Sequence, residues 1–187
     1  MRTLYAAAAM LIAAAVMLSS VQAGTEEKRS EVRASTDRVL ESLYKAQPSA
    51  RRAVEGADGG HAVFSNFGLK ILVAGGGTGK GLAVNHRTGH ETFMKMVEVQ
   101  AGLGFGAKKF GVVFVFETEE ALTHFVESGW EFGGQAAAAA KYGAKGATLE
   151  GAVSVSPGVW MYQITDKGLA AELVVKGTKY LRDGDLN

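Results

Sequence analysis

The sequence predicts an α+β fold, in which an N-terminal amphipathic helix precedes a glycine-rich, mainly antiparallel β-sheet or barrel-like domain with one or two further short helices. Three observations predict it. Apolar residues recur at helical spacing over residues 26–47. From Val97 to Gly106 they alternate with polar residues or glycine, the period of a strand with one buried face. All 25 glycines follow Ala23, and glycine amid abundant valine and phenylalanine favours closely packed strands over disorder.

The first 23 residues are typical of a cleavable secretory signal peptide. Arg2 supplies a positive start, and the segment from Leu4 to Leu18 is almost wholly apolar. Val21 and Ala23 occupy the two small positions that a signal peptidase reads. The apolar segment would form a helix of about 22 Å, short of the roughly 30 Å hydrocarbon core of a bilayer. We therefore expect cleavage near Ala23 and a periplasmic or secreted protein rather than a membrane anchor.

Removal of residues 1–23 leaves 164 of the 187 residues, enough for one domain. We divide this domain into an N-terminal helical segment, 24–58, and a β-rich part, 59–187. The chain has 20 basic and 19 acidic residues, and this balance argues against electrostatic capture of nucleic acid. Because the sequence has no cysteine, it can carry neither a disulfide nor a lipid attached to cysteine at the cleavage site.

The helix predicted over residues 26–47 has one apolar face and one charged face. The apolar face consists of Val32, Val39, Leu40, Leu43 and Tyr44. Pro48 ends the helix, and Ser49 can cap a short second helix that carries Arg51 and Arg52. Two interpretations of the apolar face stay open. It packs on the core of its own domain, or it faces a membrane.

Short apolar segments broken by glycine follow the helical segment. Residues 62–64, 69–74 and 82–84 are candidate strands, and the alternation over 97–106 predicts a further one. Residues 110–116 are almost wholly apolar, which predicts a central strand buried on both faces.

A third helix is expected to begin after Thr118, because the Thr118 hydroxyl can cap it and two glutamates follow in its first turn. Gly129 is expected to end this helix. Residues 134–140 are predicted to form a small-residue strand or close-packing segment. The C-terminal part is predicted to be strands at 152–155, 159–164 and 169–175, with Pro157-Gly158 as a hairpin turn.

A glycine-rich segment around Lys80 looks like a phosphate loop. Its glycines are Gly75, Gly76, Gly77, Gly79 and Gly81. A Walker loop needs glycine at the position of Ala74 and Ser or Thr at the position of Gly81, so this segment lacks both required residues. The dinucleotide fingerprint fails too, because strand-like residues follow. We therefore expect a structural turn or bulge, no nucleotide binding, and a fold that tolerates Lys80→Ala.

No residue pattern points to a metal, a cofactor or a reaction. His86 and His90 have the spacing of a helical zinc pair, but Gly89 interrupts the segment, which indicates solvated loop histidines. The serines lack a nucleophile elbow, and the aspartates near the C-terminus lie in turn-like contexts. We therefore expect neither an enzyme nor a bound cofactor.

Several weak motifs occur in a fixed order along the chain. They are Gly60–Phe64, the glycine segment 75–81, Val99–Gly106, Lys109–Phe116, the helix at 120–125, Phe132–Ala136 and the closing Lys179–Asn187. Over roughly residues 36–187 this series resembles the SYLF-domain family. The family is described as a lipid-binding module, whose eukaryotic branch binds phosphoinositides, partly through an amphipathic N-terminal helix, and also contacts actin. This chain departs from it at 136–140, where alanines replace the family's aspartate.

The resemblance implies a non-catalytic domain that binds phospholipids or an anionic membrane surface in the bacterial periplasm or cell envelope. A protein-interaction or envelope-stress scaffold without lipid binding is the alternative. Actin is not expected as a partner in that compartment. The candidate lipid-contact residues lie in the helical segment and are Arg33, Arg38, Leu40, Tyr44, Lys45, Arg51 and Arg52.

Overall fold

The computed structural model describes residues 2–71, 74–101, 106–132, 149–165, 168–169 and 178–187. Within these ranges it describes only the backbone of residues 2–21, 66–71, 74–77, 98–101, 106–109 and 131–132. The predicted α+β class is confirmed, with an antiparallel sheet and three helices in the described ranges.

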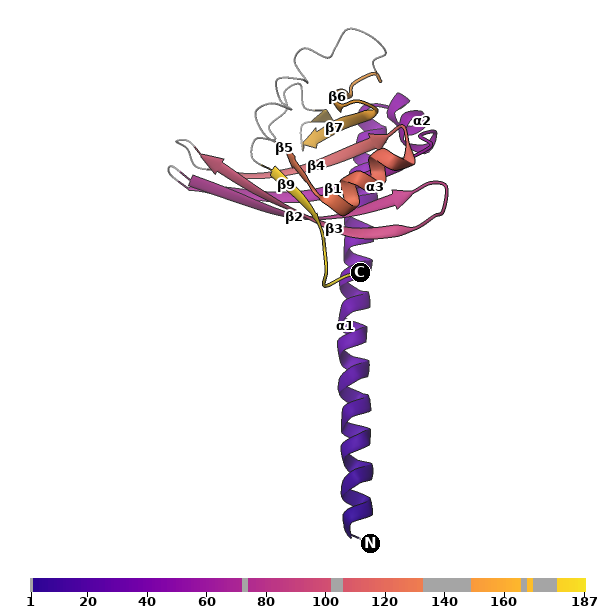
Figure 1. The fold of residues 1–187 in the computed structure, drawn as a ribbon. Coiled ribbons are helices and arrows are strands. Elements are labelled where there is room, and N and C mark those ends of the chain that lie inside the picture. Colours follow the sequence, from indigo (N-terminus) through magenta and orange to yellow (C-terminus); the bar gives the residue numbers. More distant parts are fainter. Residues whose placement is uncertain (1, 72–73, 102–105, 133–148, 166–167, 170–177) are drawn as a thin grey trace.

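The long N-terminal helix α1 spans Arg2–Ala46 and projects from the domain as a stalk at its N-terminal end (Figure 1). The helix expected from residue 26 is thus part of a longer one. Where α1 meets the sheet, a stripe of four residues is buried: Val32, Thr36, Val39 and Leu43. This stripe confirms the interpretation that the helix packs on its own domain. Among the described residues, no helix is long and apolar enough to cross a membrane.

The short helix α2 (Ser49–Glu55) follows at Pro48, as predicted, but Ser49 is not its cap. Pro48 occupies the N-cap position without a side-chain hydrogen bond to the helix. The hydroxyl of Ser49 instead accepts a hydrogen bond from Nε2 of Gln47 at 2.6 Å. Because that hydroxyl is engaged by Gln47, it stabilises the junction between α1 and α2 rather than the first turn of α2.

One curled, half-barrel sheet contains all the described strands (Figure 1). They are β1 (Gly60–Ile71), β2 (Ala74–Asn85), β3 (Glu91–Ala101), β4 (Gly106–Phe116), β5 (Trp130–Phe132), β6 (Val153–Ser156), β7 (Val159–Thr165), β8 (Gly168–Leu169) and β9 (Thr178–Arg182). Their order is β5-β9-β3-β2-β1-β4-β7-β6, with β8 beside β7. Every assigned pair is antiparallel.

Two strand predictions were wrong in their boundaries. The candidates at 62–64 and 69–74 belong largely to one long strand, β1. The alternating segment 97–106 contains the end of β3 and the first residue of β4. Residues 102–105 between them lie outside the described ranges, as do 134–140 and 170–175, on which further predictions fell.

The glycine-rich segment 75–81 is not a turn or bulge, because it lies in the regular strand β2. The glycines make room for neighbouring side chains. A Cβ atom on Gly81 would lie 2.3 Å from Cδ1 of Phe64, and one on Gly79 would lie 2.7 Å from Cγ of Met96. The turn prediction failed because it treated glycine only as a turn residue, whereas here it allows close packing.

The remaining local predictions are confirmed. Helix α3 spans Glu119–Ser128, and the hydroxyl of Thr118 accepts a hydrogen bond from the N–H of Ala121 at 3.3 Å. Gly129 follows it with φ +66°, a conformation that favours glycine. Strands β6 and β7 form the predicted hairpin through Pro157-Gly158.

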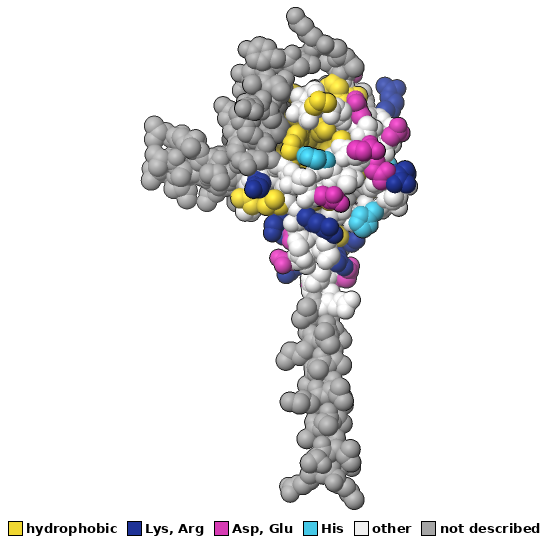
Figure 2. Space-filling model, viewed as in Figure 1, with side chains coloured by type: hydrophobic (Ala, Val, Ile, Leu, Met, Phe, Trp, Pro, Cys, Tyr) yellow, Lys and Arg dark blue, Asp and Glu magenta, His cyan; other side chains and the backbone are white. Residues whose placement is uncertain are grey.

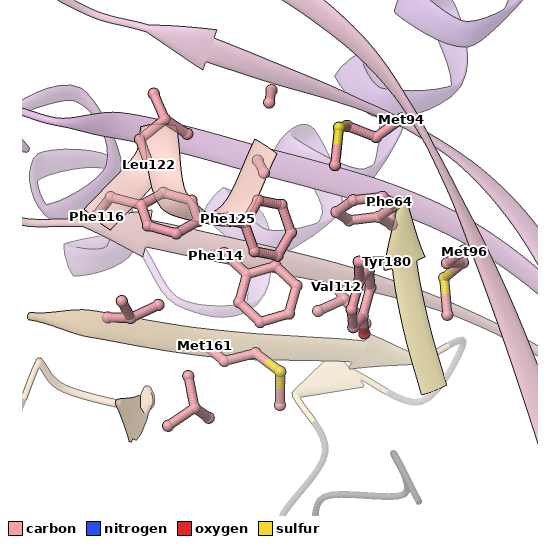
Figure 3. Packing of buried hydrophobic residues seen from close by; sticks show 14 of the residues in the cluster. Phe64, Met94, Met96, Val112, Phe114, Phe116, Leu122, Phe125, Met161 and Tyr180 are labelled. Carbon is pink, nitrogen blue, oxygen red and sulfur yellow. The ribbon is translucent and has the colours of Figure 1, made fainter. Parts of the chain in front are cut away.

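Aromatic rings fill the space between the sheet and α3 (Figure 3). The centroid of Phe114 lies 5.0 Å from that of Tyr180 and 5.3 Å from that of Phe125. Phe64 lies 4.7 Å from Tyr180. These separations are typical of favourable edge-on and tilted ring pairs. This cluster is the larger part of the core.

A second cluster lies on the opposite face of the sheet, under α1 and α2. Val63 of β1 and Val113 of β4 contact it, while the residues beside them, such as Phe64 and Phe114, point to the aromatic cluster. Strand β4 is therefore buried on both faces, as its apolar run predicts. A Cβ atom on Gly111 would lie 2.4 Å from Cγ1 of Val39, so this glycine lets α1 approach the sheet.

The last residues of the chain hold α1 against β3. Leu186 is buried with Val32, Leu82 and Phe93. Its carbonyl accepts a hydrogen bond from Nε of Arg29 at 2.8 Å. The amide side chain of Asn187 accepts from the N–H of Phe93 at 3.0 Å and donates to its carbonyl at 2.8 Å. In Figure 1 the C-terminus accordingly lies beside α1.

Candidate functional site

A groove of about 880 Å³ runs between α1 and the sheet face that this helix covers. Typical small-molecule sites have about 300–1,000 Å³. One row of side chains on the flank of α1 forms the helix wall: Glu31, Ser35, Arg38 and Ser42. Their spacing aligns them over about 16 Å of helix.

The sheet wall of the groove includes one row of residues that pair across four strands. In order, the row is Lys80 of β2, Ser65 of β1, Gly111 of β4 and Ile164 of β7. Such a row is about 14 Å long. It passes from the ammonium group of Lys80 through the hydroxyl of Ser65 to Gly111, against which Val39 of α1 packs, and then to the apolar side chain of Ile164. Along this row the sheet wall of the groove is therefore charged at Lys80 and apolar at Ile164.

Lys80 also holds the buried carboxylate of Asp183. Its ammonium group donates a hydrogen bond to Oδ2 of Asp183, whose side chain is 1% exposed, against 52% for Lys80. Burial raises the pKa of Asp183. Hydrogen bonds from Lys80 and from the N–H of Asp185, together with the charges of Lys80 and Lys95, outweigh burial, so the pKa of Asp183 lies below its ordinary value. The expectation that the fold tolerates Lys80→Ala did not include this contact, through which Lys80 neutralises a buried charge, and the substitution is therefore expected to reduce stability.

Further lysines follow Lys80 across the neighbouring strands. Two rows of paired residues lie side by side, namely Lys80–Lys95–Leu181 and Thr78–Val97–Lys179. They face the α1 side, because Lys95 and Val97 alternate with Met94 and Met96 of the aromatic cluster on the other face. Val97 is 42% exposed, unusual for a large apolar side chain. We call the residues of these two rows the lysine rows.

The lysine rows were not predicted from the sequence, because they depend on the pairing of β2, β3 and β9. One signal was available. Phe93, Lys95 and Val97 share one parity within a strand, which would have placed them on one face. The local sequence could not predict that β9 places Lys179 and Leu181 beside these residues.

Two of the predicted lipid-contact residues are engaged in ion pairs. Nε of Arg33 donates to Oε2 of Glu91 at 2.8 Å, and its guanidinium lies 5.1 Å from the ring centroid of Phe93. Nη1 of Arg51 donates to Oε1 of Glu55 at 3.0 Å, within its own helix. Because neighbouring acids partly neutralise these arginines and fix their side chains, the two arginines are less able to bind an anionic ligand.

The other five candidates fall into two groups. Leu40 and Tyr44 pack, half-buried, against the cluster under α1, and the guanidinium of Arg51 lies 4.3 Å from the Tyr44 ring centroid. Burial and the charge of Glu55 raise the pKa of Tyr44, although Arg51 opposes them. The second group, Arg38, Lys45 and Arg52, is exposed and forms no ion pair within the described side chains. Only Arg38 of the seven candidates lines the groove.

His86 pairs with His61 rather than with His90. Its Nδ1 lies 2.8 Å from the carbonyl oxygen of Ala57 and therefore donates to it. Its Nε2 then accepts from Nδ1 of His61 at 2.7 Å. Burial, and secondarily the electrostatic interaction with the neighbouring His86, lower the pKa of His61 to about 4. Within the side chains that the structure describes, no three His, Asp or Glu residues form a metal-binding group.

The α3 side of the molecule carries basic and acidic side chains intermixed (Figure 2). A smaller hollow of about 400 Å³ lies there between α3 and the β2–β3 turn, bordered by Glu119, Glu127 and Arg182. Hydrogen bonds from Arg87 and Asn85 lower the pKa of Glu119 to about 2, so this acid stays charged. An anionic surface would meet repulsion as well as attraction on this side.

Comparison with known proteins points to one family. Residues 97–187 match the family model Ysc84, described as "Las17-binding protein actin regulator". The chain is also similar to beta cell expansion factor A of Aeromonas veronii, with 33% identity over 161 residues. The matched region covers 86% of this chain and 59% of that relative, so the chain spans less than two thirds of the relative's length.

Proposed function

This chain belongs to the SYLF-domain (Ysc84) family, and we propose that it is a non-catalytic domain that binds anionic lipid surfaces in a bacterial cell envelope. One observation carries the proposal. The groove and the lysine rows bring Arg38, Lys80, Lys95 and Lys179 to one side of the sheet, together with the exposed Val97. Cations beside exposed apolar groups are what an anionic lipid surface attracts.

The helical segment alone is poorly suited to this task. Between Glu26 and Glu55 it has seven basic and six acidic residues. Its main apolar stripe is already buried against the sheet. Each base near an anionic surface contributes about 1 kcal/mol, and acids oppose it. The lysines of the sheet therefore supply attraction that the helix lacks, and binding is expected to be modest and sensitive to salt.

Charge reversal of Lys179 is expected to weaken binding to phosphatidylglycerol vesicles about tenfold at low salt. The control is Arg182→Glu. Both residues are exposed on β9, but Arg182 borders the hollow on the α3 side. Co-sedimentation measures both variants together with Arg52→Glu, which reports on the helical segment. Equal loss for Lys179→Glu and Arg182→Glu would contradict the proposed face.

Failure of the unaltered protein to sediment with any anionic lipid at low salt would exclude surface binding. A protein-interaction scaffold would then be the better proposal. Actin and Las17, named in the family description, are not proposed as partners, since we propose that the protein is exported from the cytoplasm.

Export is part of the proposal and rests on the signal-like residues 1–23. The species recovered from the periplasm is expected to begin at Gly24, because Val21 and Ala23 suit a signal peptidase. Intact-mass measurement after cell fractionation checks this. A full-length species that stays in the cytoplasm would contradict it.

A further inference from the structure

We propose that the hollow of about 400 Å³ beside α3 binds a small zwitterion, a molecule of the size of an amino acid or a dipeptide with one ammonium and one carboxylate group. The volume lies within the range of about 300–1,000 Å³ that is typical of small-molecule sites. The inference is independent of the proposed function, because the hollow lies on the α3 side of the sheet and the lysine rows lie on the other side.

The two walls of the hollow carry opposite kinds of side chain. Glu119, Thr123 and Glu127 lie on one flank of α3 at intervals of four residues, over about 12 Å of helix. The facing wall includes His90 of the β2–β3 turn and Arg182 at the end of β9. Acidic groups therefore lie on the helix wall, and basic groups lie on the sheet wall.

One acid and one base of these walls are available to a ligand. Glu119 is already engaged, because it accepts hydrogen bonds from Arg87 at 2.6 and 2.7 Å and from Asn85 at 2.9 Å. Glu127 and Arg182 are exposed and form no ion pair with each other or with any other described side chain. A zwitterion can satisfy both, with its carboxylate on the guanidinium and its ammonium group on the acid.

The floor of the hollow has a buried hydroxyl that lacks a partner. Thr92 of β3 is 5% exposed and lines the hollow, and its hydroxyl forms no hydrogen bond to any described residue. Buried polar groups are normally hydrogen-bonded, so a ligand atom above the floor would supply the missing partner. Ala83 and Leu122, both buried, complete the floor and offer apolar contact to a side chain of the ligand. The site therefore suits a zwitterion that carries an apolar side chain.

The charges of the walls also disfavour ligands with a single charge. An anion without an ammonium group would be attracted by Arg182 but repelled by Glu119 and Glu127. Glu119 stays charged near neutral pH, because the hydrogen bonds from Arg87 and Asn85 lower its pKa to about 2. A cation without a carboxylate would leave Arg182 unpaired and would be repelled by it.

The test measures binding of leucine and of glycyl-leucine at pH 7 by calorimetry. N-acetyl-leucine lacks the ammonium group and leucinamide lacks the carboxylate, so each is expected to bind about tenfold more weakly than leucine. Binding of leucine alone would identify a free amino acid as the ligand, and binding of glycyl-leucine alone would identify a peptide. Absence of binding by both, or binding of N-acetyl-leucine and leucinamide equal to that of leucine, would overturn the inference.

Matched variants locate the site. Arg182→Gln and Glu127→Gln are each expected to weaken binding of the preferred probe about tenfold. The controls are Lys179→Gln, an exposed base of the same strand, and Glu120→Gln, an exposed acid of the same helix. Neither control residue lines the hollow, so both variants are expected to bind within about twofold of the unaltered protein. Circular dichroism verifies that each variant is folded, and equal binding by Arg182→Gln and Lys179→Gln would place the ligand elsewhere.

Discussion

Replacing Lys80 with alanine is expected to lower the free energy of unfolding by about 2–3 kcal/mol near neutral pH. Among the described residues, the substitution leaves the buried carboxylate of Asp183 with one hydrogen-bond donor, the N–H of Asp185 at 3.2 Å. The lysine itself is half exposed, so its own desolvation contributes little. Urea unfolding at pH 7 measures the loss, and Lys179→Ala, an exposed lysine on the same sheet face, serves as the control.

A double-mutant cycle shows whether the loss comes from this pair. Asp183→Asn removes the buried charge and keeps an oxygen that can accept from the N–H of Asp185. In that background Lys80→Ala is expected to cost less than about 1 kcal/mol. If Lys80→Ala costs the same with Asp183 and with Asn at that position, the ion pair does not stabilise the fold.

The stability difference between the unaltered protein and Lys80→Ala is also expected to depend on pH in the acid range. The pKa of Asp183 is lower in the folded protein than its ordinary value of 3.8, so its stabilising contribution is complete above pH 3.8 and is lost as the pH falls through the folded value. Protonation of Asp183 removes the unpaired charge in Lys80→Ala. The difference in stability between the two proteins is therefore expected to shrink in this acid range.

Lowering the pH from 6.5 to 4 is expected to remove about 3 kcal/mol of stability through His61. Its pKa falls from 6.5 to about 4 on folding, so the unfolded chain binds the proton more readily over this range. The contribution is complete above pH 6.5 and is lost as the pH falls towards 4. This range lies above that of Asp183, so the two effects can be told apart.

The measurement compares unfolding free energies of the unaltered protein and His61→Gln across this pH range. The variant is expected to lose less stability on acidification, because Gln does not titrate. His90→Gln changes an exposed histidine of the neighbouring β2–β3 turn and is expected to retain the full pH dependence. An equal slope for His61→Gln and the unaltered protein would show that the pair with His86 is not responsible.

The sequence predicted the features that depend on neighbouring residues. The α+β class, the caps of α3 at Thr118 and Gly129, and the hairpin at Pro157-Gly158 follow from periodicity and turn chemistry within a few residues. The ordered motifs also predicted the family, which the comparisons confirm. The candidate site was predicted less well. Arg38 lines the groove, but Leu40 and Tyr44 pack on the core, and Arg33 and Arg51 pair with acids.

The features that only the tertiary structure decided join residues far apart in the chain. Lys80 and Asp183 are 103 residues apart, and the His61–His86 pair and the lysine rows depend on how strands align. A shift of one residue in that alignment would move each side chain to the other face of the sheet. The same holds for the glycines of β2, whose role is set by Phe64 and Met96 across the sheet. By itself the sequence determined which segments are helix or strand and which family they belong to, because those properties are local or sequential. Which charges meet, and where a groove opens, was decided by the register of the strands and by the docking of α1, because these bring distant residues together.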